Sequence, residues 1–342
     1  MKAIVVKELS EDINSIKYIN DYPEPKLSKD GDVLVQVAAA GCNFYDILMI
    51  KGTYQIKQKV PFILGTEFSG IVLDTKGKSN FKKGDKVFGC GLGAYAEKVV
   101  VSSEMVIPMP TNISFEEAAG IFITYPTSLA ALKLRANLQP GQTILVHGAS
   151  GGVGIAAVQM AKLLGAKVIA TGTDDTKLQI VKKLGVEIIN LKTAGESWKT
   201  QVLDLTNKKG VDVVYDPVGL VNESIKCLKF SGKVVVVGFA GGNHEQVASN
   251  RILLKNISVV GLHWGAYTKF EQGSILPIWK QLLTWLSSKQ LKPVIFPTIY
   301  KIEDTSKAIK LLKDRKAYGK VVVKLDQPFN SQKGNTMPES KL

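Results

Sequence analysis

The chain has 342 residues, of which 45% are hydrophobic and 22% charged, and this globular composition excludes a wholly disordered or fibrous protein. Its 44 Lys and Arg residues outnumber its 30 Asp and Glu residues, which gives a formal net charge of +14. Nearly all of the basic residues are dispersed lysines, with arginine only at Arg135, Arg251 and Arg315. Because nucleic-acid sites depend on the planar arginine fork, we expect no nucleic-acid partner.

The length favours one large or two medium-sized domains. No apolar run approaches the roughly 20 residues of a membrane span, and the apolar start at residues 3–6 soon meets charged residues. We therefore expect an intracellular chain with no signal peptide and no membrane partner. The cysteines are Cys42, Cys90 and Cys227, and the histidines are His147, His244 and His263. They are too few for a disulfide framework and form no closely spaced ligand pair, so no metal site is predicted.

The first hundred residues are predicted to form an irregular all-β domain. Short apolar or alternating stretches are separated by breaks rich in Gly, Asp and Lys, which is typical of strands joined by turns. The predicted strands are residues 3–6, 33–38, 70–73, 86–89 and 96–101.

From residue 110 onward, helical and strand patterns alternate. Ser114 and Glu117 have the spacing of a capping box that opens a helix. The predicted helices are 127–138, 152–164, 176–184, 197–205 and 223–228, and the predicted strands are 143–147, 167–171, 186–189, 211–215 and 233–237. This alternation predicts an α/β fold with a doubly wound parallel sheet covered on both faces.

The last part of the chain is expected to return to the first domain. It has helical patterns at 278–289 and 305–313 and strand patterns near 299 and at 319–325. The predicted domains are therefore 1–125 with 268–325, and 126–267. Residues 326–342 are polar and rich in Pro, Asn and Ser, and we predict that they form a disordered tail.

The strongest signal of function is a glycine-rich loop between a predicted strand and a predicted helix. It reads Gly148-Ala149-Ser150-Gly151-Gly152-Val153-Gly154. Glycine permits a sharp turn and close approach to a pyrophosphate, and the helix that follows offers its free amides to the phosphates. The next predicted strand follows at the spacing of a βαβ unit, and this context favours a dinucleotide site over a tight turn without a ligand.

The end of that second strand indicates which dinucleotide binds. An NAD site usually has an acidic residue there for the ribose 2′-hydroxyl, but this strand ends in Thr171-Gly172-Thr173. Asp174 and Asp175 are placed to serve as helix N-cap and first-turn residues. Thr173 and Lys177 suit a 2′-phosphate, although a solvated helix lysine is an alternative for Lys177. We therefore favour NADPH as the cofactor.

Several motifs occur in combination. They are Asn43 with Asp46, the stretch Pro61-Phe62-Ile63-Leu64-Gly65-Thr66-Glu67-Phe68-Ser69-Gly70, the turn Lys83-Gly84-Asp85-Lys86-Val87, the glycine loop, and Val236-Val237-Gly238-Phe239-Ala240-Gly241-Gly242. Over about residues 1–325 the chain resembles the zinc-free quinone oxidoreductases, the zeta-crystallin-like branch of the medium-chain dehydrogenase/reductase superfamily. The resemblance implies a GroES-like substrate domain with a Rossmann domain, NADPH as hydride donor, and a homodimer.

The resemblance also implies which residues act. Zinc-dependent relatives carry Cys and His ligands where this chain has Asn43 and Thr66, so a substrate oxygen would be polarised by hydrogen bonds alone. Asn43, Tyr54 and Thr127 are implied at the nicotinamide end of the site, with the backbone of Gly238, Phe239 and Ala240 beside the ring. A rim aromatic is the alternative for Tyr54, and a helix-end hydroxyl for Thr127. Leu48 stands where many members have a tyrosine, which leaves the proton donor open.

The implied activity is NADPH-dependent reduction of quinones or α,β-unsaturated carbonyls. Two alternatives stay open: a 2-enoyl thioester reductase of the same fold, and a non-enzymatic NADPH-binding protein. The sequence ends in Ser340-Lys341-Leu342, which at a free and flexible C-terminus is a peroxisomal address. We therefore expect the peroxisomal import receptor as a partner and a peroxisomal location, with a cytosolic location as the alternative.

Overall fold

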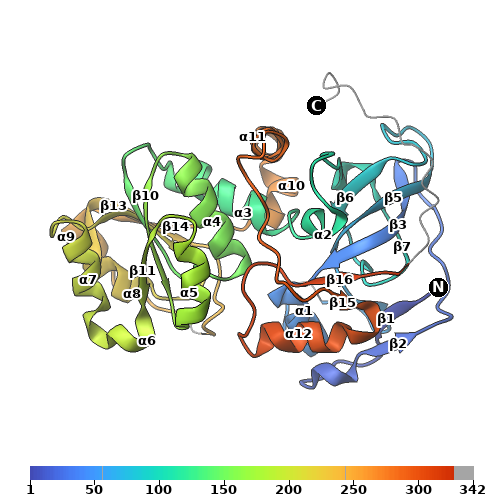
Figure 1. Ribbon diagram of the computed structural model, residues 1–342, viewed down its shortest axis with the longest axis horizontal. Helices are drawn as coiled ribbons and strands as arrows, with labels where there is room; N and C mark the ends of the chain where they lie inside the picture. Colours follow the sequence, from blue (N-terminus) through green and yellow to red (C-terminus); the bar gives the residue numbers. More distant parts are fainter. Residues whose placement is uncertain (56, 243, 327–342) are drawn as a thin grey trace. The chain divides into compact units, whose positions relative to one another are not determined.

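The computed structural model describes residues 1–55, 57–242 and 244–326, which form two compact units (Figure 1). Unit 1 comprises Met1–Ile123 with the chain from Pro293 onward, and unit 2 comprises Thr124–Lys292. Residues 268–292, which the sequence analysis assigns to the first domain, group with unit 2, because α11 (Ile275–Ser287) contacts α3 (Thr124–Ala130). Apart from Asp326, the predicted disordered tail lies outside the described residues.

Unit 2 is built on a six-stranded sheet whose neighbouring strands all run parallel. The order across it is β11 (Glu187–Asn190), β10 (Lys167–Gly172), β9 (Thr143–Val146), β12 (Val211–Asp216), β13 (Leu228–Val236) and β14 (Ser258–Gly261). When these six strands are numbered by their order along the chain, with β9 as strand 1, the order across the sheet is the Rossmann order 3-2-1-4-5-6. The direction of winding in this order reverses between β9 and β12. The predicted doubly wound parallel sheet is confirmed.

Helices cover both faces of this sheet, with α4 and α5 on one side and α7 on the other (Figure 1). Besides α3 and α11, the helices of unit 2 are α4 (Gly152–Leu163), α5 (Asp175–Lys182), α6 (Leu191–Ala194), α7 (Trp198–Leu205), α8 (Val221–Ser224), α9 (Ser249–Lys255) and α10 (Tyr267–Phe270). A π-helical stretch, Ala131–Ala136, continues α3. Cover on both faces explains why β9 and β12 are buried along almost their whole length, as parallel strands usually are.

One core of unit 2 lies between α7 and the sheet. Leu145 of β9, Ile169 of β10 and Val214 of β12 are buried there with Trp198 and Val202 of α7. Burial of a large apolar side chain contributes roughly 1.5–3 kcal/mol. This packing fixes α7 against the strands whose ends carry the predicted cofactor site.

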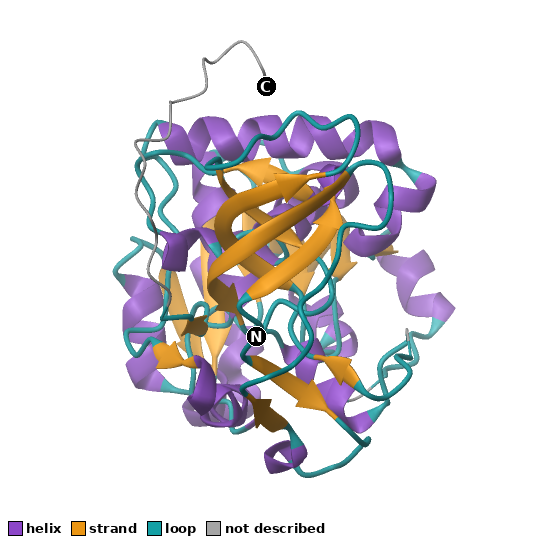
Figure 2. Cartoon of the chain, turned by 90° about the vertical axis from the view of Figure 1, so that its right-hand side faces the viewer, coloured by secondary structure: helices purple, strands orange, loops and turns teal. Residues whose placement is uncertain are grey.

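Unit 1 consists mainly of antiparallel strands, which Figure 2 shows as a strongly curved sheet. The order of the larger sheet is β15 (Tyr300–Lys301), β16 (Val322–Lys324), β3 (Asp32–Gly41), β5 (Glu67–Thr75), β6 (Lys86–Cys90) and β8 (Val106–Pro108), and β7 (Lys98–Ser102) also pairs with β3. A smaller sheet has the order β2 (Lys17–Ile19), β1 (Ala3–Val6) and β4 (Phe62–Ile63). Register shifts between β3 and β5 bend these strands, as β-bulges do. The predicted irregular β domain is confirmed.

Among its described residues, unit 1 also contains the α-helices α1 (Phe44–Lys51), α2 (Phe115–Ala118) and α12 (Thr305–Lys313). The capping box predicted for α2 is confirmed, because Glu117 N–H donates to Ser114 Oγ at 3.1 Å and Ser114 N–H donates to Glu117 Oε2 at 2.9 Å. Helix α1 is not predicted by the sequence analysis. Its sequence FYDILMIK is apolar at most positions and shows no polar stripe at helical spacing.

Among the described residues, no helix has the length and apolar character needed to cross a bilayer.

Candidate active site

The carboxyl ends of the unit 2 strands carry the predicted cofactor residues. In a parallel sheet these ends lie at one edge, and ligands bind there at the point where the winding reverses, here between β9 and β12. The glycine loop at 148–154 follows β9, Thr173 follows β10, and Gly238, Phe239 and Ala240 follow β13. Backbone hydrogen bonds join these segments to their neighbours, including Ala149 N–H to Thr171 O and Ala240 N–H to Pro217 O, both at 2.9 Å. The structure thus brings these residues to one edge of one sheet.

The shape of the glycine loop depends on close backbone approach. A Cβ on Gly154 would overlap the carbonyl oxygen of Gly148 and lie 2.8 Å from the Cα of Ala149. The start of α4 can therefore lie against the loop only with glycine at this position. Gly151 differs, because its Cβ would meet only the oxygen of Gly148, at 3.4 Å, which is an ordinary contact.

The N-terminus of α4 fits a pyrophosphate group. The N–H groups of its first turn, residues 152–154, have no intrahelical acceptors, and its N-cap, Gly151, has no side chain to bond them. The helix has twelve residues, and its positive dipole end favours an anion. Ser128 Oγ donates to Val153 O at 2.8 Å, which ties this first turn to α3. These residues suit the phosphates of a dinucleotide.

The junction between β10 and α5 is the predicted site of the adenosine ribose. Asp174 is the N-cap of α5 and accepts the Lys177 N–H at 3.0 Å, and Asp175 stands in the first turn, so both predicted roles are confirmed. The Lys177 ammonium lies 3.9 Å from Asp174 Oδ2, and its side chain is only 14% exposed. Thr173 is exposed directly after β10. An ammonium and a hydroxyl therefore occur at the same strand–helix junction.

Unit 1 contains a buried ion pair beside the predicted catalytic asparagine. Glu67, at the start of β5, is 0% exposed, and Lys320, just before β16, is 3% exposed. The Lys320 ammonium pairs with Glu67 Oε1 and donates to Asn43 Oδ1 at 2.8 Å. Glu67 Oε2 accepts the backbone N–H of Ile123 at 3.1 Å. Both oxygens of the carboxylate thus have donors, as a buried charge requires.

The side-chain amide of Asn43 is engaged within this cluster. Its Nδ2 donates to Glu67 Oε1 at 2.9 Å and, more weakly, to Gly41 O at 3.3 Å, and the residue is only 6% exposed. A substrate oxygen could take over only the longer of these two bonds. The observed contacts make Asn43 a bridge between Glu67 and Lys320, and its role in polarising a substrate stays a prediction.

A second buried carboxyl group lies in α1. Asp46 is 0% exposed, and its Oδ2 accepts the Asn43 N–H at 2.8 Å and the Tyr95 hydroxyl at 2.6 Å. Its Oδ1 has no hydrogen-bond partner within the described part of the chain. Burial raises the pKa of Asp46 to about 7, and the bonds from Tyr95 and Asn43 only partly oppose this effect. The group therefore titrates near neutral pH.

We expect the Asp46 carboxyl group to make folding pH-dependent. Because its folded pKa of about 7 lies above the ordinary value of 3.8, its contribution to stability is full below about pH 4 and is lost as the pH rises to 7, a change on the order of 4 kcal/mol. The Asp46→Asn variant keeps an oxygen that can accept both bonds but has no proton to lose. Urea unfolding of both proteins at pH 5 and pH 8 should show the variant gaining relative stability at the higher pH. A difference that does not change with pH would contradict the assignment.

The other predicted catalytic residues belong to different units. Tyr54 follows α1 in unit 1, and its ring centroid lies 5.3 Å from that of Tyr45. Burial raises the pKa of both phenols, so both remain protonated hydrogen-bond donors at neutral pH. Thr127 lies half-buried in α3 of unit 2. The structure brings Tyr45 against Tyr54, a pairing that the sequence analysis does not predict.

The two positions that carry zinc ligands in relatives differ in their surroundings. The Asn43 side chain is hydrogen-bonded to Glu67 and Lys320, whereas the Thr66 hydroxyl is buried and has no hydrogen-bond partner among the described residues. Across residues 1–55, 57–242 and 244–326, no group of three or more His, Cys, Asp or Glu side chains is placed to hold a metal ion. The expected absence of zinc stays a prediction, which metal analysis of the purified protein can test.

No role of Glu67 or Lys320 is predicted from the sequence. Each is the single charged residue of an otherwise uncharged stretch, at 62–70 and at 320–323. A charged residue at a strand position that is predicted to be buried needs a partner. This need is the signal in the sequence that points to Glu67 and to Lys320. It does not identify that partner, because 253 positions separate the two residues.

Comparison with known proteins agrees with this architecture. Residues 29–111 match the family model "Alcohol dehydrogenase GroES-like domain", and residues 152–280 match "Zinc-binding dehydrogenase". The structure of Escherichia coli quinone oxidoreductase complexed with NADPH is similar to this structure, with a TM-score of 0.85 and 27% sequence identity. The match covers 95% of this chain and 100% of the other chain. The structure of CurK enoyl reductase has a TM-score of 0.83 and 25% identity, covering 95% and 99% of the two chains.

The sequence relatives identify the family. Quinone oxidoreductase-like protein 2 homolog of Nematostella vectensis is 36% identical over 301 residues, which cover 86% of this chain and 82% of the relative. Quinone oxidoreductase-like protein 2 of Bos taurus is 36% identical over 306 residues, with coverages of 88% and 87%. Identity at this level across most of both chains shows that the protein belongs to the zinc-free quinone oxidoreductase branch of the medium-chain dehydrogenase/reductase superfamily and is an oxidoreductase that uses NAD(P)H.

Proposed function

We propose that this protein is an NADPH-dependent reductase that transfers hydride to quinones or α,β-unsaturated carbonyls without zinc. The observation that carries the proposal is the uncapped, glycine-lined start of α4 at the reversal point of the Rossmann sheet. The membership of this chain in the zinc-free quinone oxidoreductase branch supports hydride transfer as the class of reaction. When bound, NADPH supplies the hydride, and the residues of the chain bind, orient and polarise the reactants.

Each part of the proposed site has a separate task. The first-turn amides of α4 bind the pyrophosphate, Thr173 and Lys177 bind the 2′-phosphate, and the backbone of residues 238–240 flanks the nicotinamide. Tyr54, which keeps its phenolic proton because burial raises its pKa, donates a hydrogen bond to the acceptor oxygen. Asn43 and Thr127 are the other proposed polar groups of the nicotinamide end. The proton that completes reduction comes from solvent.

A side-by-side assay tests the proposed function. NADPH oxidation is measured with 1,2-naphthoquinone, with a small enone and with a 2-enoyl-CoA thioester, at equal concentrations. Turnover of the quinone or the enone, with the thioester slower, is the expected result. Dominant thioester turnover favours a 2-enoyl thioester reductase, an alternative supported by the likeness to CurK enoyl reductase. Binding of NADPH without oxidation by any acceptor favours a non-enzymatic NADPH-binding protein.

The preference for NADPH over NADH is expected to depend on Lys177. An ammonium–phosphate pair at a partly exposed site is worth about 1–3 kcal/mol, or roughly ten- to a hundredfold in affinity. Lys177→Ala should weaken NADPH binding by about that factor and leave NADH binding unchanged. Lys182→Ala, in the last turn of the same helix, is the matched control and should change neither. Fluorescence titration of the nicotinamide measures both affinities, and equal binding of the two cofactors by the unmodified protein would refute the preference.

The proposed assembly is a homodimer. Unit 2 exposes Leu253 (79%) and Leu254 (76%) on α9 and Phe230 (67%) on β13, and β14 ends the sheet as an edge strand. Exposed apolar side chains beside an open edge strand suit contact with a second copy. Light scattering should give the dimer mass, and a Leu253→Glu/Leu254→Glu variant should give the monomer mass.

The proposed location is the peroxisome, reached through the import receptor. Support comes from the tripeptide Ser340-Lys341-Leu342 alone, which lies outside the described residues. Removal of these three residues should move the protein from peroxisomes to the cytosol without changing its thermal unfolding. Continued co-sedimentation of the truncated protein with peroxisomes would contradict the proposed role of the tripeptide.

A further inference from the structure

A buried histidine lies beneath the glycine loop and has no part in the function proposed above. His147 directly follows β9 and precedes Gly148, and it is 0% exposed. Its backbone N–H donates to Tyr215 O at 3.0 Å, which continues the pairing of β9 with β12. Its ring meets the indole of Trp198 edge-on, with centroids 5.5 Å apart and planes at 89°. The ring is therefore held in one orientation.

Both ring nitrogens are bonded, and their partners fix the tautomer. Nδ1 lies 2.7 Å from Thr171 Oγ1, and Nε2 lies 2.8 Å from Ser224 Oγ. The Ser224 hydroxyl donates its single hydrogen to Leu220 O at 2.6 Å, because a carbonyl oxygen can only accept. Nε2 must then donate to Ser224, and Nδ1 of the neutral ring accepts the Thr171 hydroxyl. Burial lowers the pKa of His147 to about 4, although Asp216 opposes the shift, so the ring is neutral at physiological pH.

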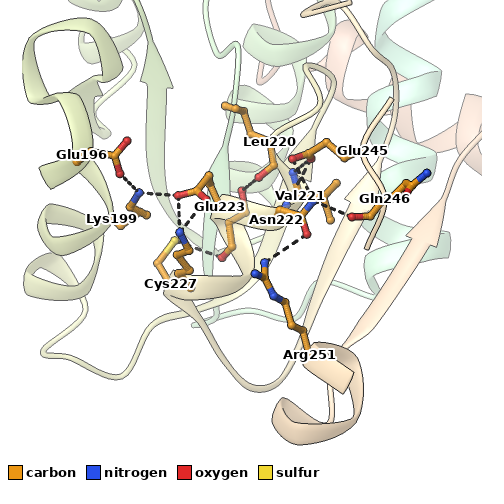
Figure 3. A network of polar contacts seen from close by, with 12 residues as sticks. Glu196, Lys199, Leu220, Val221, Asn222, Glu223, Cys227, Glu245, Gln246 and Arg251 are labelled. Atoms are coloured by element: carbon orange, nitrogen blue, oxygen red, sulfur yellow. Dashed lines mark hydrogen bonds and ion pairs between the residues drawn. The ribbon is translucent and has the colours of Figure 1, made fainter. Parts of the chain in front are cut away.

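The serine side of this bridge belongs to a rigid turn. Figure 3 shows α8 held at its start by Glu245, whose carboxylate accepts the N–H groups of Val221 and Asn222. The N–H of Leu220 donates to Asp216 Oδ2 at 2.6 Å. Glu223 of the same turn pairs with Lys199 of α7. A turn anchored at both of its ends is a fixed support for the Ser224 hydroxyl.

The threonine side of the bridge belongs to the strand that leads to the ribose junction. Thr171 is two residues before Thr173 and is 0% exposed. Its carbonyl accepts the N–H of Ala149 at 2.9 Å, and its hydroxyl bonds His147. Two bonds thus connect the start of the glycine loop to the end of β10, one through the backbone and one through the imidazole.

We propose that His147 is a positioning residue for the cofactor: as the neutral Nε2–H tautomer, it fixes the glycine loop between the end of β10 and α8, so that the α4 amides are already arranged for the pyrophosphate. The inference rests on the proposed binding of NADPH. A loop ordered before binding loses no freedom when the ligand arrives, whereas a loosened loop loses it at the expense of affinity. His147 acts through the loop and touches neither substrate nor cofactor.

Affinity measurements on isosteric variants test the inference. His147→Phe keeps an aromatic ring against Trp198 but removes both nitrogens, and Thr171→Val removes the hydroxyl at constant shape. Each should raise the Kd for NADPH by about tenfold or more. The double variant should bind no worse than His147→Phe alone, because His147→Phe already removes the bond that Thr171→Val breaks. The conservative Thr171→Ser should restore affinity to within about twofold of the unmodified protein.

A stability control separates positioning from general damage. Thr206 donates its hydroxyl to Val202 O at 2.9 Å and accepts the N–H of Gly210, at the end of α7 away from the glycine loop. Thr206→Val should lower the melting temperature but leave the Kd for NADPH unchanged. If His147→Phe does not fold, the comparison of Thr171→Val with Thr171→Ser still decides. Unchanged affinity in Thr171→Val, or losses that add in the double variant, would overturn the inference.

The tautomer has a direct spectroscopic signature. Nitrogen-15 chemical shifts of the His147 imidazole should report a neutral ring protonated at Nε2 throughout pH 6–8, with or without NADPH. A ring protonated at Nδ1, or one charged in this range, would also overturn the inference. Failure of the unmodified protein to bind NADPH would overturn the proposed function as well, whereas normal binding with unaffected variants contradicts the role of His147 alone.

Discussion

Gly154→Ala is expected to lower both the stability of the free protein and its affinity for NADPH, whereas Gly151→Ala should lower the affinity alone. The new methyl group at position 154 would occupy the space of the Gly148 carbonyl oxygen, which is backbone and cannot rotate away. The start of α4 must then move from the loop, at a cost of about 2–4 kcal/mol. We expect NADPH affinity to fall by roughly a hundredfold or more, since the displaced amides no longer converge on the pyrophosphate.

Gly151→Ala is the matched control within the same loop. Gly151 has φ −74° and ψ 171°, which alanine adopts freely, and its Cβ would meet only one atom at 3.4 Å. The free protein should therefore melt at nearly the same temperature as the unmodified one. A methyl group at Gly151 still obstructs the close approach of the pyrophosphate to the loop backbone, so NADPH should bind about tenfold more weakly.

Thermal unfolding without ligand and calorimetric titration with NADPH measure these two effects separately. A Gly154→Ala protein of normal stability and affinity would show that the loop and α4 do not need close approach. A Gly151→Ala protein that binds NADPH normally would place the pyrophosphate elsewhere.

The sequence predicts most of unit 2 and little of the cluster in unit 1, for a physical reason. Parallel strands buried on both faces are continuous apolar runs between glycine-rich breaks, so β9, β10 and β12 are visible in the sequence. The glycine loop is local, and its residues need only one another and the next strand to be recognised. Strand β14 is short, with the sequence SVVG, and forms only by pairing with β13, so the sequence analysis does not predict it.

The features of unit 1 that the sequence does not predict depend on contacts between distant segments. Helix α1 is apolar at most positions, and it packs against α12 with Ile47, Met49 and Ile50 buried in the core of unit 1. A helix that is apolar beyond its buried face lacks the amphipathic pattern that marks a helix in a sequence. Glu67 and Lys320 meet only after β16 pairs with β3 and β3 pairs with β5. The return of the chain to unit 1 at Pro293 instead of residue 268 has the same origin, since α11 carries an apolar face that only packing assigns to a unit.

Lys320→Met is expected to destabilise unit 1 by about 3–5 kcal/mol, although methionine fills nearly the same space. The ammonium of Lys320 pairs with Glu67 and bonds Asn43 Oδ1 and Cys42 O, so its removal leaves a fully buried carboxylate without a counter-charge. Within the described residues, the neutral groups Asn43 Nδ2 and Ile123 N still donate to Glu67. These do not offset the cost of keeping a charge out of water.

The double variant Lys320→Met/Glu67→Gln is expected to recover most of that loss. The glutamine side chain carries no charge, and its oxygen can still accept from one of the two neutral donors, so the large cost of an isolated buried charge disappears. The two substitutions should thus be strongly non-additive, with the double variant more stable than Lys320→Met alone. Lys208→Met breaks an ion pair whose side chains are 67% and 56% exposed, and this control should change stability by less than about 1 kcal/mol.

Urea unfolding at pH 8 tests this interpretation of the ion pair. The free energy of unfolding of Lys320→Met should fall below that of the unmodified protein by about 3–5 kcal/mol, and that of the double variant should fall by much less. If Lys320→Met is as stable as the unmodified protein at pH 8, or if the double variant is less stable than either single variant, the stabilising role of this pair is wrong. The position of Asn43 would then have to be fixed by its bonds to Gly41 and Asp46 instead of by the buried ion pair.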